Sequence, residues 1–263
     1  MDERTRAVAR VWGTGSAPVG SAFLVGPRTL LTCTHVVAAA RGQGRLVTPP
    51  VGSKVEVDFP ARPGEFWPAH VIACQPVESD GVGDVAVLEL PADAPLEIRP
   101  AILIEAPDLW RHACSAFGFP RGFGNGTYAS GVLLSVEATG WLEIDDRDGR
   151  SVEPGFSGAP VWDEQYPAGV VAMVVASRPG DVAYAIPVAT LMTAWPPLAG
   201  LARPPSPTGD CCPSRPRTRA STAAATRTPQ SCSTWSAGSR WWPSWAHRGW
   251  ASRHWSWRDC CRE

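Results

Sequence analysis

The sequence predicts an all-β fold, organised as a sandwich or a barrel. Up to about residue 190, short runs rich in aliphatic and aromatic residues alternate with Gly, Pro and Asp. The runs recur at roughly the 8–12-residue spacing typical of such folds, and no long segment has the 3.6-residue period of a helix. The 263 residues, 44% of them hydrophobic, suffice for one large all-β domain or two modest ones.

The apolar runs are candidate strands, and they fall into two similar halves. The first half has runs at 6–13, 20–26, 29–37, 54–59, 70–77 and 84–90. The second half has runs at 113–119, 128–136, 140–144, 158–162, 169–177 and 182–188. Residues 92–101 look like the connector between the halves. We therefore place one domain at 1–96 and a second at 97–200.

One short helix is expected near the end of the second half. The segment "PVATLMTAW", 187–195, is followed by Pro196 and Pro197, which cannot continue a helix. From about residue 201 the composition changes abruptly to Pro, Arg, Ser, Thr, Cys and Trp. Because such a segment has too few aliphatic residues for a packed core, we expect residues 201–263 to be disordered.

This tail has two interpretations. From residue 203 onward it carries ten Arg against three acidic residues, with seven Trp between 235 and 257. That composition suits a basic aromatic segment for membranes or single-stranded nucleic acid. We favour out-of-frame translation of a GC-rich gene. The Trp codon is TGG and Cys codons begin with TG. When the gene is read from the third base of each codon, a residue followed by Trp or Cys therefore gives a codon that ends in TG, which usually encodes Leu, Val or Met. "HWSWRDCC" would then encode Leu, Glu, Ala and Arg, which suits an amphipathic helix of an adaptor-type domain.

Charge and cysteine usage predict a cytoplasmic protein. The formal net charge of −1 gives no reason to expect a nucleic-acid or membrane partner. The first residues, "MDERTRAVARVWG", lack the apolar run of a signal peptide, and no stretch approaches the roughly 18 apolar residues of a membrane span. Cys33, Cys74 and Cys114 are scattered along the chain and do not resemble a disulfide framework, so we expect reduced thiols.

The segment "EPGFSGAPVWD", 153–163, places Ser157 in a glycine-rich turn just before an apolar run. A Ser hydroxyl is a weak nucleophile unless a base lies within hydrogen-bond reach and a third group orients that base. Backbone amides in a glycine turn can also stabilise an oxyanion. The alternative is an ordinary turn residue. The hypothesis of a nucleophile therefore requires a His and a carboxylate elsewhere in the chain.

Three histidines before the tail are candidates for the base. His35 ends the apolar run "TLLTCTHVV", where we expect it at the rigid edge of a strand, whereas His70 and His112 lie in less distinctive surroundings. For the carboxylate, Asp84 opens the apolar run "DVAVLEL". Asp80 is a rival but lacks the apolar strand behind it. Each residue alone is more often a surface, turn or core residue than a catalytic one.

The three motifs together resemble the trypsin-like, chymotrypsin-fold serine proteases. "LTCTHVV", "DVAVLEL" and "GFSGAPV" occur in the family's order, and "GSAFLVGPRTLLTCTHVV" is similar to its strand before the His. The likeness is greatest to the bacterial branch without disulfides, which includes the high-temperature-requirement proteases, and to peptidase domains of actinobacterial multidomain conflict or signalling proteins. It covers about residues 8–195. It implies two antiparallel six-stranded β-barrels with the active site in the cleft between them.

The resemblance also implies a role for each matching residue. Ser157 would attack the scissile carbonyl, His35 would take the serine proton and protonate the leaving amine, and Asp84 would orient the imidazole. The amides of Gly155 and Ser157 would form the oxyanion hole. The implied activity is that of a serine endopeptidase acting on intracellular proteins in a regulatory or defence role.

Two positions depart from trypsin itself. Phe156 stands where trypsin-type zymogens carry an Asp that receives a new N-terminus, so activation by N-terminal cleavage is not expected. Ser151, six residues before the nucleophile, argues against cleavage after Arg or Lys, because a buried charge would lack a partner. We expect a pocket for a small or medium apolar side chain, which Asp181 would complicate. The other predicted pocket residues are Ala176, Ser177 and Ala183.

No cofactor or metal is predicted, because His, Cys and Asp do not cluster at metal-ligand spacing in the first 202 residues. The expected partners are a protein or peptide substrate and effector or adaptor domains. A second class of function stays open. A protease fold that has lost catalysis can still grip a peptide in its cleft by strand addition. An intact triad argues against such an idle module.

Overall fold

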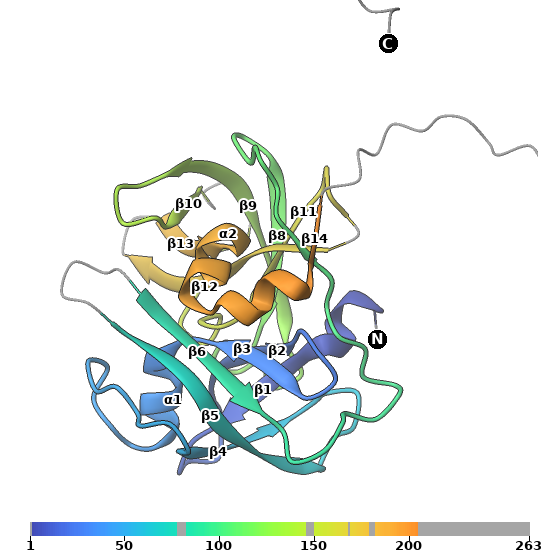
Figure 1. The fold of residues 1–263 in the computed structure, drawn as a ribbon, viewed down its shortest axis with the longest axis vertical. Coiled ribbons are helices and arrows are strands. Elements are labelled where there is room, and N and C mark those ends of the chain that lie inside the picture. Colours follow the sequence, from blue (N-terminus) through green and yellow to red (C-terminus); the bar gives the residue numbers. More distant parts are fainter. Residues whose placement is uncertain (1, 78–82, 146–149, 168, 179–181, 205–263) are drawn as a thin grey trace, which may run out of the picture. The chain divides into compact units, whose positions relative to one another are not determined.

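Two closed barrels of six antiparallel strands each form the structure, with the first barrel below the second in Figure 1. The computed structural model describes residues 2–77, 83–145, 150–167, 169–178 and 182–204. The predicted all-β, two-barrel fold is confirmed. Disorder from residue 201 is wrong at the start of the tail, because Ala202–Arg203 form a short strand. From residue 205 onward the tail lies outside the described residues.

The first barrel has the strand order β1-β2-β3-β6-β5-β4 and closes through pairing of β1 with β4. Its strands are β1 (Val8–Trp12), β2 (Pro18–Leu24), β3 (Thr29–Thr32), β4 (Lys54–Asp58), β5 (Phe66–Val77) and β6 (Gly83–Glu89). In β4 the side chains of Val55 and Val57 are buried while Lys54 and Glu56 face solvent, the alternation that a one-sided strand requires. Strand β6, by contrast, is buried from Asp84 to Leu88.

The second barrel has the order β11-β8-β9-β10-β13-β12 and closes through pairing of β11 with β12. Its strands are β8 (Ala113–Gly118), β9 (Thr127–Val136), β10 (Leu142–Asp145), β11 (Pro160–Asp163), β12 (Val170–Arg178) and β13 (Val182–Pro187). Two short strands, β7 (Leu103–Ile104) and β14 (Ala202–Arg203), extend this sheet beyond β12 in parallel pairing.

Short helices account for the remaining regular structure. The predicted helix near 187–195 is confirmed as α2 (Val188–Ala194), and the 3₁₀ turn η2 (Pro196–Gly200) follows it. Another 3₁₀ turn, η1 (Arg4–Ala7), precedes β1. No helix in the described part of the chain is both long and apolar enough to span a bilayer.

The expected strand at 29–37 is wrong in its second half. Strand β3 ends at Thr32, Cys33 is extended, and the helix α1 (Thr34–Ala40) begins. The β-branched residues Thr34, Val36 and Val37 mask the helix in the sequence, but three consecutive Ala residues favour it. Gly42, at φ +68°, allows the left-handed turn that ends many helices. His35 therefore lies in the first turn of a helix and not on a strand.

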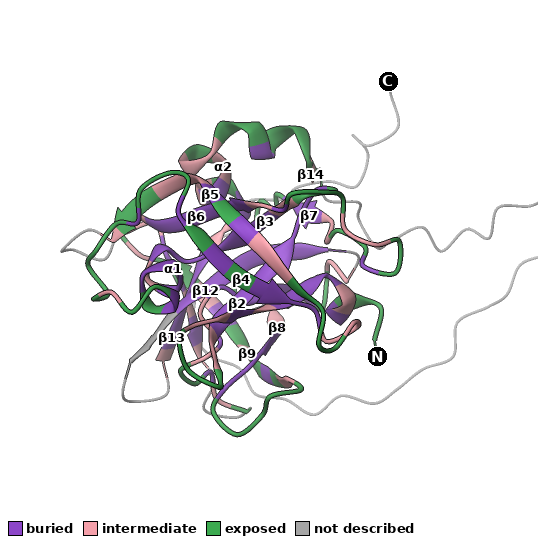
Figure 2. Ribbon diagram, turned by 90° about the horizontal axis from the view of Figure 1, so that it is seen from below, coloured by how far each residue is buried: buried purple, intermediate pink, exposed green. Residues whose placement is uncertain are grey.

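Buried residues, purple in Figure 2, occur along the strands of both barrels, and the apolar ones among them form the core. One cluster extends from the first barrel into residues of the second, including Phe119, Met173 and Ile186, while a smaller cluster lies within the second barrel alone. Because the larger cluster is continuous across both barrels, their packing fixes side chains contributed by one barrel relative to those of the other.

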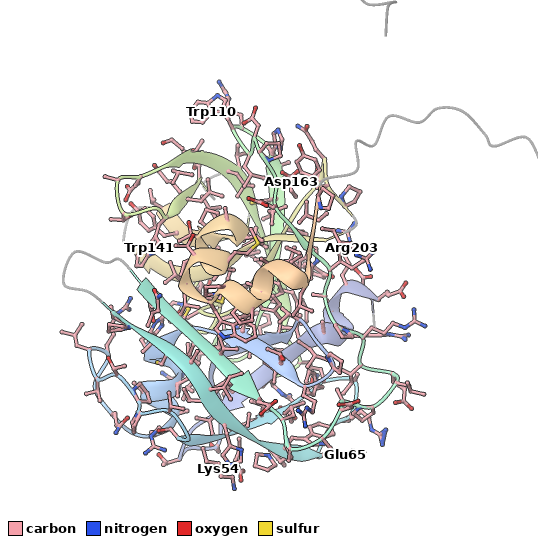
Figure 3. The ribbon with its side chains drawn as sticks, viewed as in Figure 1. Lys54, Glu65, Trp110, Trp141, Asp163 and Arg203 are labelled. Atoms are coloured by element: carbon pink, nitrogen blue, oxygen red, sulfur yellow. The ribbon has the colours of Figure 1, made fainter. Side chains whose placement is uncertain are left out.

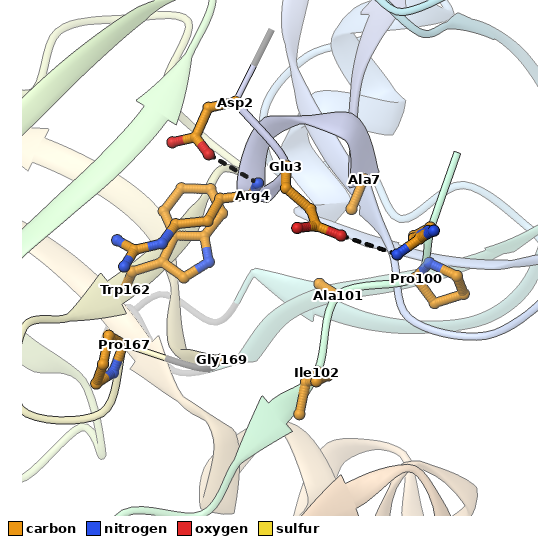
Figure 4. Close-up of a pocket in the computed structure, with 11 residues that line it drawn as sticks. Asp2, Glu3, Arg4, Ala7, Pro100, Ala101, Ile102, Trp162, Pro167 and Gly169 are labelled. Atoms are coloured by element: carbon orange, nitrogen blue, oxygen red, sulfur yellow. Dashed lines mark hydrogen bonds and ion pairs between the residues drawn. The ribbon is translucent and has the colours of Figure 1, made fainter. Parts of the chain in front are cut away.

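The N-terminal segment contacts both the connector and the second barrel. Glu3 forms an ion pair with Arg99 in the connector at 2.9 Å, and the Tyr128 hydroxyl on β9 donates to Asp2 at 2.9 Å. A cavity of about 470 Å³ lies beside this segment and is bounded on another side by the buried Trp162 (Figure 4). None of the predicted catalytic residues lines it.

Candidate active site

His35 and Asp84 form a buried pair in the first barrel. The imidazole Nδ1 lies 2.5 Å from Oδ2 of Asp84, and the His35 backbone amide donates to Oδ1 at 2.9 Å. The Asp84 side chain is fully buried, and that of His35 is 13% exposed. A carboxylate can only accept, so Nδ1 carries the shared hydrogen and Nε2 of the neutral ring is left as a base.

The backbone at Asp84 is held in an unusual conformation. Its φ is +66°, a region that non-glycine residues seldom adopt, although Asp tolerates it better than most. The preceding Gly83, at φ +84°, has no room for a side chain, because a Cβ there would lie 2.3 Å from the Pro76 carbonyl oxygen. These two residues turn the carboxylate inward at the start of β6, toward the first turn of α1.

Ser157 approaches this pair from the second barrel. Its carbonyl accepts from the Ser21 amide on β2 at 2.8 Å. Beside it, the Cys33 thiol, two residues before His35, donates to the Val174 carbonyl on β12 at 3.4 Å. The segment that carries His35 therefore contacts the strand next to the serine turn, since Gly158 also donates to Val174 at 2.8 Å.

The hydroxyl of Ser157 has a different partner from the one a triad requires. It donates to the Val175 carbonyl at 3.4 Å, and within the described residues no hydrogen bond joins it to His35. Catalytic hydrogen bonds are often long or misaligned without a bound substrate. The structure thus brings His35 and Asp84 into direct contact and places Ser157 at the adjoining face of the other barrel.

The turn around Ser157 leaves two amides without acceptors. The carbonyl of Gly155 accepts from the Phe119 amide at 3.3 Å and from the Ser21 hydroxyl at 3.0 Å. The amides of Gly155 and Ser157, however, donate to no atom of the described residues. These are the two amides expected to form the oxyanion hole.

Both glycines of this turn are required by geometry. Gly155 has φ +110°, and a Cβ there would lie 2.4 Å from the Phe119 carbonyl oxygen. Gly158 has φ +83°, and a Cβ there would lie 2.0 Å from the Ser21 carbonyl oxygen. A larger residue at 155 would clash with the 119–120 segment of the second barrel, and one at 158 would push the turn away from β2 of the first barrel.

One group in the described residues could hold a metal ion. Ligand atoms of Cys33, His35 and Asp84 all lie within 4.8 Å of one another. Yet His35 and Asp84 already bond each other, and burial, together with the nearby Asp84 charge, raises the pKa of the Cys33 thiol well above its usual value. A thiolate ligand is therefore disfavoured here, and the absence of a metal stays a prediction.

The predicted pocket residues do not share one cavity lining. Ser151 lines a cavity of about 180 Å³ with Phe123, Thr127, Arg150 and other residues of the 120–127 and 150–156 segments. Ala183 is fully buried in the core of the second barrel and is not part of that lining.

The remaining residues of the pocket prediction are only partly covered. Ala176 and Ser177 lie on β12, opposite Tyr184 and Ala183, and the structure describes only their backbone. Asp181 and the rival carboxylate Asp80 lie outside the described residues. The preference for small or medium apolar side chains therefore stays a prediction.

A second cavity, of about 400 Å³, adjoins the oxyanion turn and draws on both barrels. The first barrel contributes Trp12 and residues 16–19 to its lining. The second barrel contributes residues 119–122, Gly124 and residues 154–155. This cavity lies between the two barrels and borders Gly155, so it is part of the cleft in which the active site is expected. Apart from Gly155, its residues were not predicted from the sequence, because the segments 16–19 and 119–124 carry no catalytic motif.

The other two histidines have different surroundings. His70 is exposed on β5, opposite Lys54. His112 forms a second buried pair, with Nδ1 2.7 Å from Oδ2 of Asp163. Asp163 is the last residue of β11 and is labelled in Figure 3. Asp163 also accepts from the Gln165 amide. In the described residues no hydrogen bond joins this pair to the turn of Ser157, so His35 remains the candidate base.

Comparison with protein families matches residues 20–173 to the Trypsin-like peptidase domain, which is more than half of the chain. The chain belongs to the trypsin-like peptidase family. The matched region begins in β2, contains His35, Asp84 and Ser157, and ends in β12. The resemblance seen in the sequence is thereby confirmed. Comparison with curated proteins finds no match.

Solved structures of serine proteases share this fold. The serine endoprotease from Yersinia pestis has a TM-score of 0.55 and 19% identity, with 74% of this chain and 64% of that chain covered. The HtrA-type protease AlgW with a tripeptide has a TM-score of 0.56 and 21% identity, with 74% and 61% covered. The Rv3671c protease of M. tuberculosis, in an inactive form, has a TM-score of 0.54 and 19% identity, with 76% and 91% covered.

These likenesses concern the fold. The chain spans 64% and 61% of the length of the Yersinia and AlgW proteases. Fold and family together are those of the trypsin-like serine endopeptidases.

Proposed function

We propose that the chain hydrolyses peptide bonds through Ser157, His35 and Asp84. The observation that carries the proposal is the buried His35–Asp84 pair, which lies next to a turn whose Gly155 and Ser157 amides are unpaired among the described residues. A base and its orienting carboxylate activate a Ser hydroxyl as a nucleophile, and the oxyanion donors stabilise the charge that the attack creates.

The chemistry follows the standard two-stage route. The Ser157 oxygen attacks the scissile carbonyl while Nε2 of His35 takes the hydroxyl proton, and the negative charge on the carbonyl oxygen is met by the two amides. The carbon–nitrogen bond then breaks as His35 returns the proton to the leaving amine. Water, activated in the same way, releases the acid product and restores Ser157. Asp84 stays ionised and stabilises the imidazolium in both stages.

The proposal requires the Ser157 hydroxyl to turn from Val175 toward His35. Its present hydrogen bond to the Val175 carbonyl, at 3.4 Å, is at the long limit and weak. The exchange that the proposal requires is a rotation about one side-chain bond, from the Val175 carbonyl to Nε2. The barrier is that of an ordinary rotamer change and poses no obstacle to turnover.

The natural substrates are proposed to be intracellular proteins, cut after small or medium apolar residues in a regulatory or defence role. The specificity rests on Ser151, which offers no charge to a bound Arg or Lys. A peptide library incubated with the protein would define the residue before the cleaved bond. Dominant cleavage after Arg or Lys would contradict the pocket assignment.

A fluorophosphonate probe separates the enzyme from an idle peptide-binding module. An active triad should place the label on Ser157, as located by peptide mapping, and Ser157→Ala and His35→Ala should abolish it. His112→Ala is the matched control, because His112 also pairs with a buried Asp but lies elsewhere. Absence of labelling in the parent protein, together with peptide binding, would favour the idle module.

A further inference from the structure

We propose that Ser21, in the first barrel, is a positioning residue. It holds the turn of residues 155–158 so that the Gly155 and Ser157 amides stay available to a substrate oxyanion. The inference rests on the proposed function, since it assigns a role in the same reaction. Ser21 lies in β2, is fully buried, and belongs to neither the triad nor the pair of oxyanion amides.

Ser21 contacts the serine turn at two points. Its backbone amide donates to the Ser157 carbonyl at 2.8 Å, and its hydroxyl donates to the Gly155 carbonyl at 3.0 Å. Its own carbonyl accepts from the Thr32 hydroxyl on β3 at 2.7 Å. Donors and acceptor of this one residue are therefore all engaged, which fixes its orientation in the barrel wall.

The two Ser21 contacts lie on either side of the Ser157 amide, which is one of the two expected oxyanion donors. The Ser157 N–H belongs to the peptide group that lies between the carbonyls of Gly155 and Ser157. The Phe156 carbonyl of this same group accepts from the Ala159 amide at 2.8 Å, so rotation of the group would break that bond. The anchors on Ser21 hold the two neighbouring peptide groups and restrict the shifts that such a rotation requires. The anchors use the oxygen side of the turn, and they leave the amides of Gly155 and Ser157 without acceptors among the described residues.

The turn needs such an anchor because its own sequence is permissive. Gly155 and Gly158 both have positive φ and no side chain to restrict them. Phe156, which stands where zymogen-type relatives carry an Asp, is an apolar side chain that is only 1% exposed. It packs against Gly118, where a Cβ would lie 2.7 Å from the Phe156 ring. Packing therefore fixes the ring, but no charge at this position orders the amides.

The hydroxyl anchor can be removed alone. Ser21→Ala deletes the bond to Gly155 and keeps the backbone bond to Ser157. We expect kcat to fall by about three- to tenfold, the range for one neutral hydrogen bond, with KM changed less than twofold. The inhibition constant of a peptide aldehyde, whose hemiacetal oxyanion needs the same amides, should rise by a similar factor. Binding of the cleaved peptide product should not change.

Ser53→Ala is the matched control. Ser53 is a buried Ser of the same barrel, and its hydroxyl has no hydrogen-bond partner in the described structure. Its replacement should leave kcat, KM and aldehyde affinity unchanged. If Ser21→Ala does not fold, Thr32→Val removes the bond behind Ser21 and should lower kcat with the same unchanged KM.

The possible outcomes are distinguishable. A parent protein without hydrolysis would refute the proposed function itself. An active parent whose Ser21→Ala variant, or Thr32→Val variant if the first does not fold, keeps the parent kcat would overturn the role of Ser21. Equal losses in kcat and product affinity would also overturn it, because they would indicate a general distortion.

Discussion

His35 and His112 show how surroundings decide the role of a single side chain. In each, Nδ1 lies within 2.7 Å of a carboxylate oxygen of a fully buried Asp, and the side-chain exposures of the two histidines are similar. Only His35 lies next to the turn of Ser157. In the sequence, His35 is favoured by its place at the end of an apolar run and then by motif order, but neither "LTCTHVV" nor "WRHACS" reveals which pair will face a nucleophile.

This contrast gives a paired prediction. Asp84→Asn should lower kcat by about 10⁴-fold, because an amide stabilises the wrong imidazole tautomer and cannot balance the imidazolium. Asp163→Asn should leave kcat near the parent value, although it weakens a buried hydrogen bond in the second barrel. Steady-state kinetics of both variants on one peptide substrate would check this. Equal losses in both variants would argue that stability, rather than catalysis, explains the effect of Asp84.

The thiols near the site give a second prediction at this scale. Burial raises the pKa of both Cys33 and Cys74 above the usual thiol value. Raised pKa values keep the thiols protonated at neutral pH, and the thiolate is the reactive form. In the folded protein, Cys33 should resist alkylation throughout pH 7–9, while half-buried Cys74 should react slowly and faster as pH rises.

Mass mapping of alkylated peptides would separate these two thiols from those of the tail. The raised thiol pKa values also make the stability of the fold depend on pH. A thiol whose pKa is raised in the folded state favours folding below the pKa that it has in the unfolded chain. That contribution is lost as pH rises through the folded pKa. Rapid labelling of Cys33 at pH 7 without unfolding would contradict the burial that protects it.

At the scale of elements, strands were more predictable than the contacts between them. Alternation in β4 and continuous burial in β6 follow from their apolar patterns. The helix α1 was missed, because its β-branched residues also suit a strand and tertiary packing overrides such weak preferences. The pairing of Ser21 with Gly155 joins residues 134 positions apart, and no local pattern encodes it.

Arg10 provides another contact between elements that sequence could not reveal. On β1 it faces Asp58 of β4, with Nε donating to Oδ1 at 2.8 Å and a second bond from its Nη2. Its Nη1 donates to the Gly124 carbonyl in the second barrel at 2.6 Å. The guanidinium also lies 5.9 Å from the ring centre of Phe119, whose amide bonds Gly155.

We predict that this ion pair matters more than the exposed pairs of the same barrel. Side-chain exposure is 11% for Arg10 and 1% for Asp58. Arg10→Ala would leave the Asp58 charge buried without its cationic partner, although the Trp12 indole N–H still donates to it at 2.6 Å. Removing one partner of a buried ion pair typically costs about 3–5 kcal/mol of unfolding free energy. The matched control is Arg28→Ala, which breaks a half-exposed pair with Glu89 and should cost less than about 1 kcal/mol. Urea denaturation of both variants would measure the difference, and similar losses would contradict a special role for Arg10.

At the scale of the whole molecule, the two barrels act as one unit because their cores are continuous. The larger apolar cluster includes residues from β1 to η2, so the core of the first barrel continues into the second. The triad candidates use this arrangement, with His35 and Asp84 from one barrel and Ser157 from the other. The sequence indicated two halves from repeated strand patterns, but it could not show how the halves pack.

The end of the described structure decides where the tail can be removed. Leu198 in η2 is fully buried, and Ala202 and Arg203 of β14 pair with Leu103 and Ile104 of β7. The Arg203 carbonyl also accepts from the Glu105 amide at 3.3 Å. Residues up to 203 therefore belong to the second sheet, three residues beyond the predicted end of the second domain at residue 200.

A chain ending at Pro204 should keep the parent kcat/KM and melting temperature, since it retains every described strand. A chain ending at Leu201 should melt at a lower temperature, because β14 and its hydrogen bonds to the β7 edge are lost. Peptide hydrolysis and thermal unfolding of the two truncated chains would test this difference, and resequencing of the gene would test for a reading-frame slip near the boundary.

If the frame is verified and the chain ending at Pro204 loses activity while remaining folded, the tail is a functional element. Binding to anionic vesicles or single-stranded nucleic acid would then decide which of the two ligand classes its Trp and Arg residues serve.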